Sequence, residues 1–278
     1  MSARSYAMRD SVTMLRRNLR HALRYPSLTL GTLLIPVLVL LLFVGVFGGT
    51  LGAGIGGSNG RASYIAFVAP AIIVMAATSG SVSTAVSVAA DMTAGIINRF
   101  RTMAISPASV LTGHVVGSVI QTLISIGLVI GVAVLMGFRP NADLVEWFAA
   151  IGLLTLVTLA LTWLSAGAGL VAKSVESASN LPTPFVFLPF LGSGFVPTES
   201  MPAGVRWFAE NQPFTPIIET LRGLLTGTPI GNDAVIALAW GVALTLAGYL
   251  GARAAFRRDP APATHRTLAK LSGPSTGS

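Results

Sequence analysis

The sequence predicts an all-α integral membrane protein with six transmembrane helices. Of its 278 residues, 53% are hydrophobic and only 10% are charged, and the mean hydropathy is +0.74. Soluble domains carry roughly 25% charged residues, so a soluble globular fold of this size is excluded. The apolar residues also form long runs, whereas a transmembrane β-barrel requires short segments of alternating polarity.

Six apolar runs are long enough to cross a bilayer, which takes about 20 helical residues each. In chain order, the predicted spans cover about 28–48, 62–90, 109–136, 147–172, 177–196 and 234–251. All six belong to one transmembrane domain, residues 1–258. The fifth span contains Pro182, Pro184 and Pro189, and proline removes a backbone donor and kinks a helix. A straight fifth helix is therefore not expected.

The segments outside the spans supply the remaining elements. Residues 1–25 predict an amphipathic helix on the inner membrane surface, with arginines directed toward anionic lipid headgroups. A short helix is expected between the second and third spans. Short outer helices, resting at the membrane interface, are expected between the fifth and sixth. Residues 259–278 are rich in Pro, Ser and Gly and are predicted to form a disordered cytoplasmic tail.

The placement of Lys and Arg predicts the orientation in the membrane. With both termini in the cytoplasm, 14 of the 18 Lys and Arg residues lie on the inner side, as the positive-inside rule requires. The net charge of +8 is then mostly a topology signal, and nucleic acid is not an expected partner. The predicted location is the plasma membrane, with the spans in contact with membrane lipid.

The sequence lacks the constellations of an enzyme or a metal site. Cysteine is absent, and His21, His114 and His265 are too dispersed for a zinc site. Neither Lys173 nor Lys270 follows a glycine, so there is no phosphate-binding loop. His114 is interpreted as a hydrogen-bonded interfacial residue, because the spans offer no charged partners for a proton relay. We expect no enzymatic activity and no cofactor bound by this chain.

The segment between the second and third spans, residues 91–110, mixes charged with apolar residues. Ile96, Phe100 and Met103 lie about one turn apart and form one face of a short predicted helix. An amphipathic helix of this kind docks in the groove of a partner protein. The alternative interpretation, which composition alone favours, is a simple connector with positive-inside arginines.

This segment resembles the signature region of ABC type-2 export permeases, specifically the daunorubicin-resistance-like branch. The matching residues are Asp91, Gly95, Arg99, Phe100 and Arg101. Asn98 stands where that family usually has Glu, and Met103-Ala104 replaces its Leu-Pro pair. The resemblance implies a helix that couples the chain to a cytoplasmic ATPase. The implied coupling residues are Asp91, Gly95, Ile96, Ile97, Asn98, Arg99, Phe100, Arg101 and Met103.

A second stretch, residues 187–225, resembles the fifth span and the following outer segment of the same family. The matching residues are Ser193, Gly194, Phe195, Pro197, Met201, Pro202, Trp207, Asn211, Pro213 and Arg222. A broken helix near a dimer interface would shape a substrate path, whereas a kink that serves packing alone is the alternative. The residues expected along this path and its outer gate are Pro189, Gly194, Phe195, Pro197 and Trp207.

The outer segment also contains two charge pairs at helical spacing. Arg206 precedes Glu210 by four residues, and Glu219 precedes Arg222 by three. We expect both pairs to stabilise short outer helices weakly.

By this resemblance, the chain is the membrane half of an ATP-driven exporter, and a separate cytoplasmic subunit binds ATP and Mg²⁺. The expected cargo is hydrophobic or amphiphilic, such as a drug, an antibiotic or a lipid. A second permease copy, identical or not, is the other expected partner. The alternatives are a non-transporting membrane scaffold or assembly protein, an ion-coupled secondary transporter and, last, a membrane enzyme.

Overall fold

A computed structural model describes residues 34–54, 60–93 and 107–257 of the chain. These residues form helices joined by short turns and contain no strand. Four helices are long and apolar enough to cross a membrane, and they correspond to the second, third, fourth and sixth predicted spans. They are α4 (Gly60–Thr93), α6 (Pro107–Leu135), α7 (Leu144–Val171) and α12 (Asp233–Arg257).

The first predicted span is described only from residue 34 onward. There it forms a shorter apolar helix, Leu34–Val46, whose last six residues have π-helical geometry (η1, Leu41–Val46). The short helix α3 (Gly48–Gly54) follows. Arg61, at the start of α4, donates hydrogen bonds to the carbonyls of Val44 and Gly45, at 3.1 and 3.2 Å. The predicted amphipathic helix at 1–25 and the predicted tail at 259–278 lie outside the described residues.

The predicted fifth span, 177–196, is not one helix. Three short pieces occupy most of this region: α8 (Val175–Asn180), α9 (Thr183–Phe187) and the 3₁₀-helix η2 (Leu188–Leu191). Prolines 182, 184 and 189 supply no backbone N–H group, so an uninterrupted ladder of helical hydrogen bonds cannot form. The sequence predicted a helix that is either broken or kinked, and the structure shows a break.

The short outer helices are present. They are η3 (Thr198–Ser200), α10 (Ala203–Asn211) and α11 (Phe214–Thr226). On α10, the large side chains of Val205, Trp207 and Phe208 are exposed. By contrast, α11 packs against α4, α7 and α12, and most of its residues are buried. Helix α11 is thus part of the packed bundle, and the position of α10 and α11 relative to the membrane interface stays a prediction.

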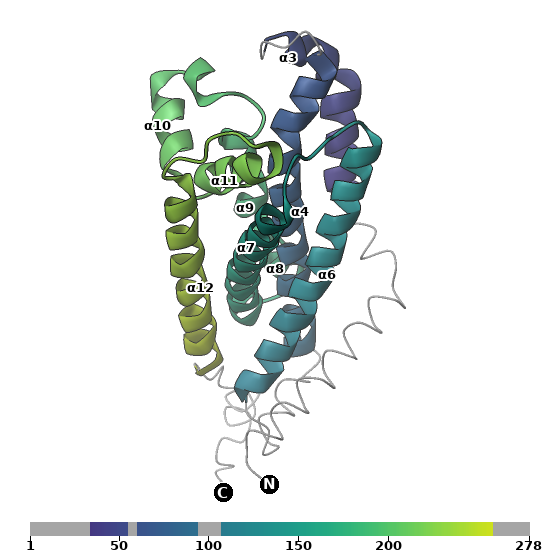
Figure 1. Cartoon of the computed structure of the whole chain (residues 1–278). Helices are drawn as coiled ribbons and strands as arrows, with labels where there is room; N and C mark the ends of the chain where they lie inside the picture. The colour runs from purple at the N-terminus through teal and green to yellow at the C-terminus, as the bar shows by residue number, and fades with distance from the viewer. Residues whose placement is uncertain (1–33, 55–59, 94–106, 258–278) are drawn as a thin grey trace, which may run out of the picture.

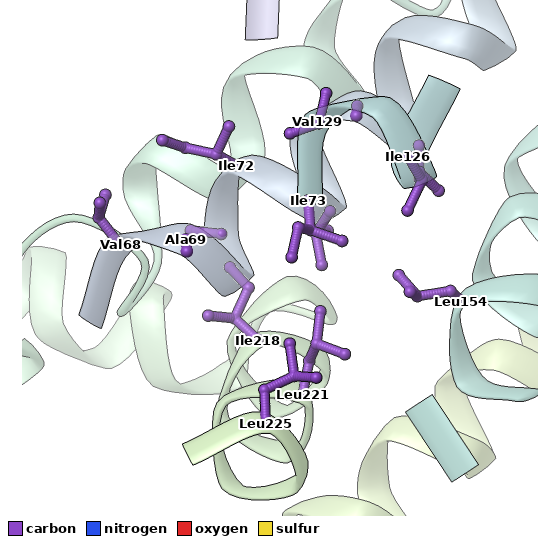
Figure 2. Close-up of a cluster of buried hydrophobic side chains, with 14 of the residues drawn as sticks. Val68, Ala69, Ile72, Ile73, Ile126, Val129, Leu154, Ile218, Leu221 and Leu225 are labelled. Carbon is purple, nitrogen blue, oxygen red and sulfur yellow. The ribbon is translucent and has the colours of Figure 1, made fainter. Parts of the chain in front are cut away.

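Helix α4 lies at the centre of the bundle and contacts α3, α6, α7, α8 and α11 (Figure 1). Every residue from position 68 to position 81 is buried, so this stretch is covered on all sides. Figure 2 shows side chains of α4, α6, α7 and α11 meeting in one apolar core. The labelled members are Val68, Ala69, Ile72, Ile73, Ile126, Val129, Leu154, Ile218, Leu221 and Leu225.

Two glycines allow the neighbours of α4 to approach closely. A Cβ atom on Gly80 would lie 2.3 Å from the Thr122 hydroxyl of α6. A Cβ atom on Gly169 of α7 would lie 2.5 Å from the carbonyl oxygen of Ala85. Glycine is thus required at both contacts, since real side chains do not approach so closely. In contrast, α12 leaves most of its apolar side chains exposed, as expected of a helix at the edge of a membrane bundle.

Candidate functional site

The residues singled out by the sequence lie at the two ends of the bundle. At the first, which we call the loop end, α4 stops at Thr93 and α6 begins at Pro107. At the second, the far end, α4 begins at Gly60 next to α3, and α10 and α11 lie near it (Figure 1).

The loop end contains a partly buried polar contact between the two helices. His114 Nε2 of α6 lies 2.9 Å from Asp91 Oδ2 of α4, and the two side chains are 5% and 18% exposed. The prediction that His114 is hydrogen-bonded is confirmed, and its partner is Asp91, the first of the predicted coupling residues. The contact joins the helices on either side of residues 94–106. The other predicted coupling residues, Gly95, Ile96, Ile97, Asn98, Arg99, Phe100, Arg101 and Met103, lie outside the described residues.

The far end is organised around the buried guanidinium of Arg222. Its Nε and Nη2 atoms donate to the carbonyl of Phe67 in α4, at 3.2 and 3.1 Å, and Nη2 also donates to the carbonyl of Ser193 at 2.9 Å. Nη1 donates to the carboxylate of Glu219, one turn earlier on α11. The guanidinium also lies 4.0 Å from the centre of the Phe67 ring, a cation–π arrangement.

Arg222 makes more contacts than the weak ion pair with Glu219 that the sequence predicted. The residue is only 8% exposed, because α11 packs into the core against α4. Burial lowers the pKa of the Arg222 guanidinium, and the carboxylate of Glu219 raises it. The other predicted pair is present and exposed: Arg206 Nε lies 3.1 Å from Glu210 Oε1, and both side chains are at least 40% exposed.

Three of the five predicted path residues lie together at the far end. Pro189, Gly194 and Phe195 are buried. A Cβ atom on Gly194 would lie 2.5 Å from the Ala71 side chain of α4 and 3.0 Å from the carbonyl of Pro189. The segment that contains these residues is therefore pressed directly against α4.

Phe195 belongs to an aromatic cluster. Its ring stacks on Phe190 with 4.6 Å between centroids and tilts against Phe43 at 4.7 Å. The other two predicted path residues lie elsewhere: Pro197 is half-buried, and Trp207 is 68% exposed on α10.

A further polar group at this end was missed by the sequence reasoning. Gln212 joins α10 to α11, and its Nε2 donates to the Thr215 hydroxyl at 3.2 Å and to the carbonyl of Leu188 at 3.3 Å. The Thr215 hydroxyl donates in turn to the carbonyl of Ala209. The available signal was a glutamine directly before a proline, Gln212-Pro213. Among the described residues, no group of three His, Asp or Glu side chains is placed to hold a metal ion.

Comparison with known proteins identifies the class of molecule that this bundle represents. The family model for ABC-2 type transporters matches residues 10–226. The chain therefore belongs to the ABC-2 type transporter family and is a multi-pass membrane permease. The match includes both polar contacts described above, at Asp91–His114 and at Arg222.

Relatives of the chain bear names of drug-resistance permeases. The chain is 26% identical to the daunorubicin resistance ABC transporter permease protein DrrB1 of Streptomyces coeruleorubidus, over 81% of this chain and 78% of that protein. It is 23% identical to the probable doxorubicin resistance ABC transporter permease protein DrrC of Mycobacterium tuberculosis, over 62% of this chain and 63% of that protein.

Proposed function

We propose that the chain is the membrane subunit of an ATP-driven exporter of hydrophobic or amphiphilic molecules, such as a drug, an antibiotic or a lipid. The observation that carries the proposal is the family match over residues 10–226, together with relatives named for resistance to daunorubicin and doxorubicin. The apolar character of the bundle supports a cargo that partitions into membranes.

ATP and Mg²⁺ bind to a separate cytoplasmic ATPase in this proposal. The sequence contains no phosphate-binding loop of its own. Residues 94–106 contact the ATPase and carry the predicted coupling residues Arg99 and Phe100. The Asp91–His114 contact supports this assignment, because it joins the two helices that lead into and out of that segment. Both termini then face the cytoplasm, as the positive-inside rule favours.

A second permease copy completes the transport path. Phe195 is 5% exposed and packed between aromatic rings, so in this conformation it lines no path that solvent reaches. Transport then requires a rearrangement between two states, driven by nucleotide-dependent movement of the ATPase. The exposed apolar faces of α6 and α12 offer surface for the second copy and for lipid.

The first test is purification of the tagged chain from its native membrane in mild detergent, followed by mass spectrometry. We expect an ATPase subunit with a phosphate-binding loop in comparable amount. Recovery of no ATPase, even after cross-linking, would favour the scaffold or the secondary transporter instead.

The second test is the double substitution Arg99→Ala and Phe100→Ala, assayed in the purified complex. We expect the ATPase to bind and hydrolyse ATP while export of daunorubicin, used as the probe, is lost. The matched control replaces Arg139 and Phe148, one arginine and one exposed phenylalanine near the other end of the bundle, and we expect it to export normally. Normal export by the 99/100 variant would remove these residues from the coupling mechanism.

A further inference from the structure

Arg222 joins three segments that are far apart in the sequence. The guanidinium uses four of its five N–H groups, and three of these bonds end on main-chain carbonyls at Phe67 and Ser193. A hydrogen bond to a side chain persists when that side chain changes rotamer, so it constrains the backbone little. A hydrogen bond to a main-chain carbonyl constrains the position of the backbone directly. Arg222 therefore fixes α4, the turn at residues 192–195 (the Ser193 turn) and α11 relative to one another.

Arg222 contacts α4 at Phe67, close to Pro70, where the helix lacks one backbone hydrogen bond. Pro70 has no N–H group, so the carbonyl of Ala66 loses its helical partner, and the helix bends most easily there. Phe67 lies on the outer side of Pro70, within the first turns of α4. Arg222 holds these first turns by the Phe67 carbonyl and by contact with the Phe67 ring.

The Ser193 turn is packed too closely against its neighbours to move independently of them. A Cβ atom on Gly194 would meet the Ala71 side chain at 2.5 Å, and one on Gly192 would meet Gln212 Nε2 at 2.4 Å. The turn is thus packed against α4 on one side and against the α10–α11 corner on the other. The hydrogen bond from Arg222 to the Ser193 carbonyl adds a directional link to this close packing.

Stability alone does not require an arginine at this position. Removing an arginine from water is costly, and an apolar side chain of similar volume often gives a more stable core. An apolar side chain cannot hold two main-chain carbonyls at once. We infer that Arg222 is a positioning residue for transport: it holds the first turns of α4, the Ser193 turn and α11 together, so that the three move as one body between the two transport states. The transport part of this inference rests on the proposed function, and its structural part does not.

The structural part is tested by distance measurement on the purified chain. Because the sequence contains no cysteine, single cysteines for spin labels can be introduced at Ala62 and Val196, both exposed. The two positions report on the first turns of α4 and on the Ser193 turn. We expect one narrow distance distribution with Arg222 present. In Arg222→Lys, which keeps the charge but lacks the planar fork, we expect a clearly broader distribution. An unchanged distribution would overturn the inference.

A matched control and a milder variant distinguish loss of the Arg222 contacts from misfolding of the protein. Arg206→Lys changes an arginine that pairs with Glu210 on exposed α10, and we expect it to leave the distribution unchanged. If Arg222→Lys does not fold, Glu219→Gln replaces it, since this variant removes only the charged partner of the guanidinium. We expect partial broadening in Glu219→Gln, and an unchanged distribution there would likewise contradict the inference.

The transport part is tested in the complex with its ATPase. We expect the native distance distribution to be the same without nucleotide and in the vanadate-trapped state, whereas Arg222→Lys gives two different distributions.

Daunorubicin export per ATP hydrolysed should fall roughly tenfold in Arg222→Lys, since losing one hydrogen bond to a charged group corresponds to about that factor. A native distribution that shifts with nucleotide would refute movement as one body. If the native complex neither hydrolyses ATP nor exports the probe, the proposed function fails, and the measurement on the chain alone still decides the role of Arg222.

Discussion

Substitution at the contact between Gly80 of α4 and Thr122 of α6 tests how closely these two central helices pack. In Gly80→Ala, the new methyl group would lie 2.3 Å from the Thr122 hydroxyl and 2.7 Å from its methyl group. Ordinary van der Waals contact starts near 3.4 Å, so the two helices must separate by about 1 Å. Thr122 is buried and β-branched, and its side chain therefore has few alternative rotamers.

We expect Gly80→Ala to lower the free energy of unfolding by about 2 kcal/mol, the middle of the range for overpacked cores. For a chain of this size, that loss corresponds to a fall of roughly 4–8 °C in the apparent Tm. The assay is thermal unfolding of the detergent-purified chain, followed by size-exclusion chromatography of the fluorescently tagged protein. Gly127→Ala on α6 is the control, because nothing lies within 4 Å of its new methyl group.

A double substitution separates the clash from other effects. Thr122→Ala removes both atoms that Gly80→Ala would meet most closely and leaves only the Cβ atom at 3.0 Å. We therefore expect the double variant to recover at least half of the stability lost in Gly80→Ala, which is a coupling of about 1 kcal/mol. Additive effects of the two substitutions, or a Gly80→Ala protein as stable as the native one, would show that α4 and α6 are not in close contact here.

Three further substitutions test other parts of the bundle by the same thermal unfolding assay. His114→Ala should destabilise the chain by about 1.5–3 kcal/mol, because it removes a partly buried hydrogen bond to the carboxylate of Asp91; a loss below 0.5 kcal/mol would argue against this contact. Phe195→Ala should cost about 3–5 kcal/mol by emptying the aromatic cluster, whereas Phe148→Ala, at a residue 74% exposed, should change stability little. Gly227→Ala should cost about 1 kcal/mol, since this residue ends α11 with a φ of +75°; no loss there would contradict the left-handed cap.

The long spans could be predicted from the sequence because length and apolarity are local properties. The helices α4, α6, α7 and α12 follow directly from uninterrupted apolar runs. The fifth span shows the limit of this reasoning: its residues are also uncharged, but their prolines lead to three short helical pieces. Proline content predicts a disturbance of the helix. Whether the helix bends or breaks depends on the surrounding contacts.

The role of Arg222 shows a second limit. Its spacing from Glu219 is the same in an exposed pair as in a buried one, and we interpreted it only as a weak pair on an outer helix. A signal for the buried arrangement was present, because Ile218, Arg222 and Leu225 lie four and three residues apart and so share one face of α11. An arginine on the apolar face of a helix predicts a buried partner. The identity of that partner, a carbonyl 155 residues earlier in the chain, depends on tertiary structure.

The length of α4 has a consequence for how the protein is placed in its bilayer. Residues 62–90 carry no charge, and at 1.5 Å per residue they rise about 44 Å, close to the 40–45 Å thickness of a bilayer with its headgroups. A nearly upright α4 therefore places Arg61 in one headgroup layer and Asp91 in the other. Each of these residues makes a contact described above, with the π-helical turn and with His114. A change in membrane thickness would therefore strain the contacts of Arg61 and Asp91 before others. Lipid chain length would in this way affect both ends of the permease at once.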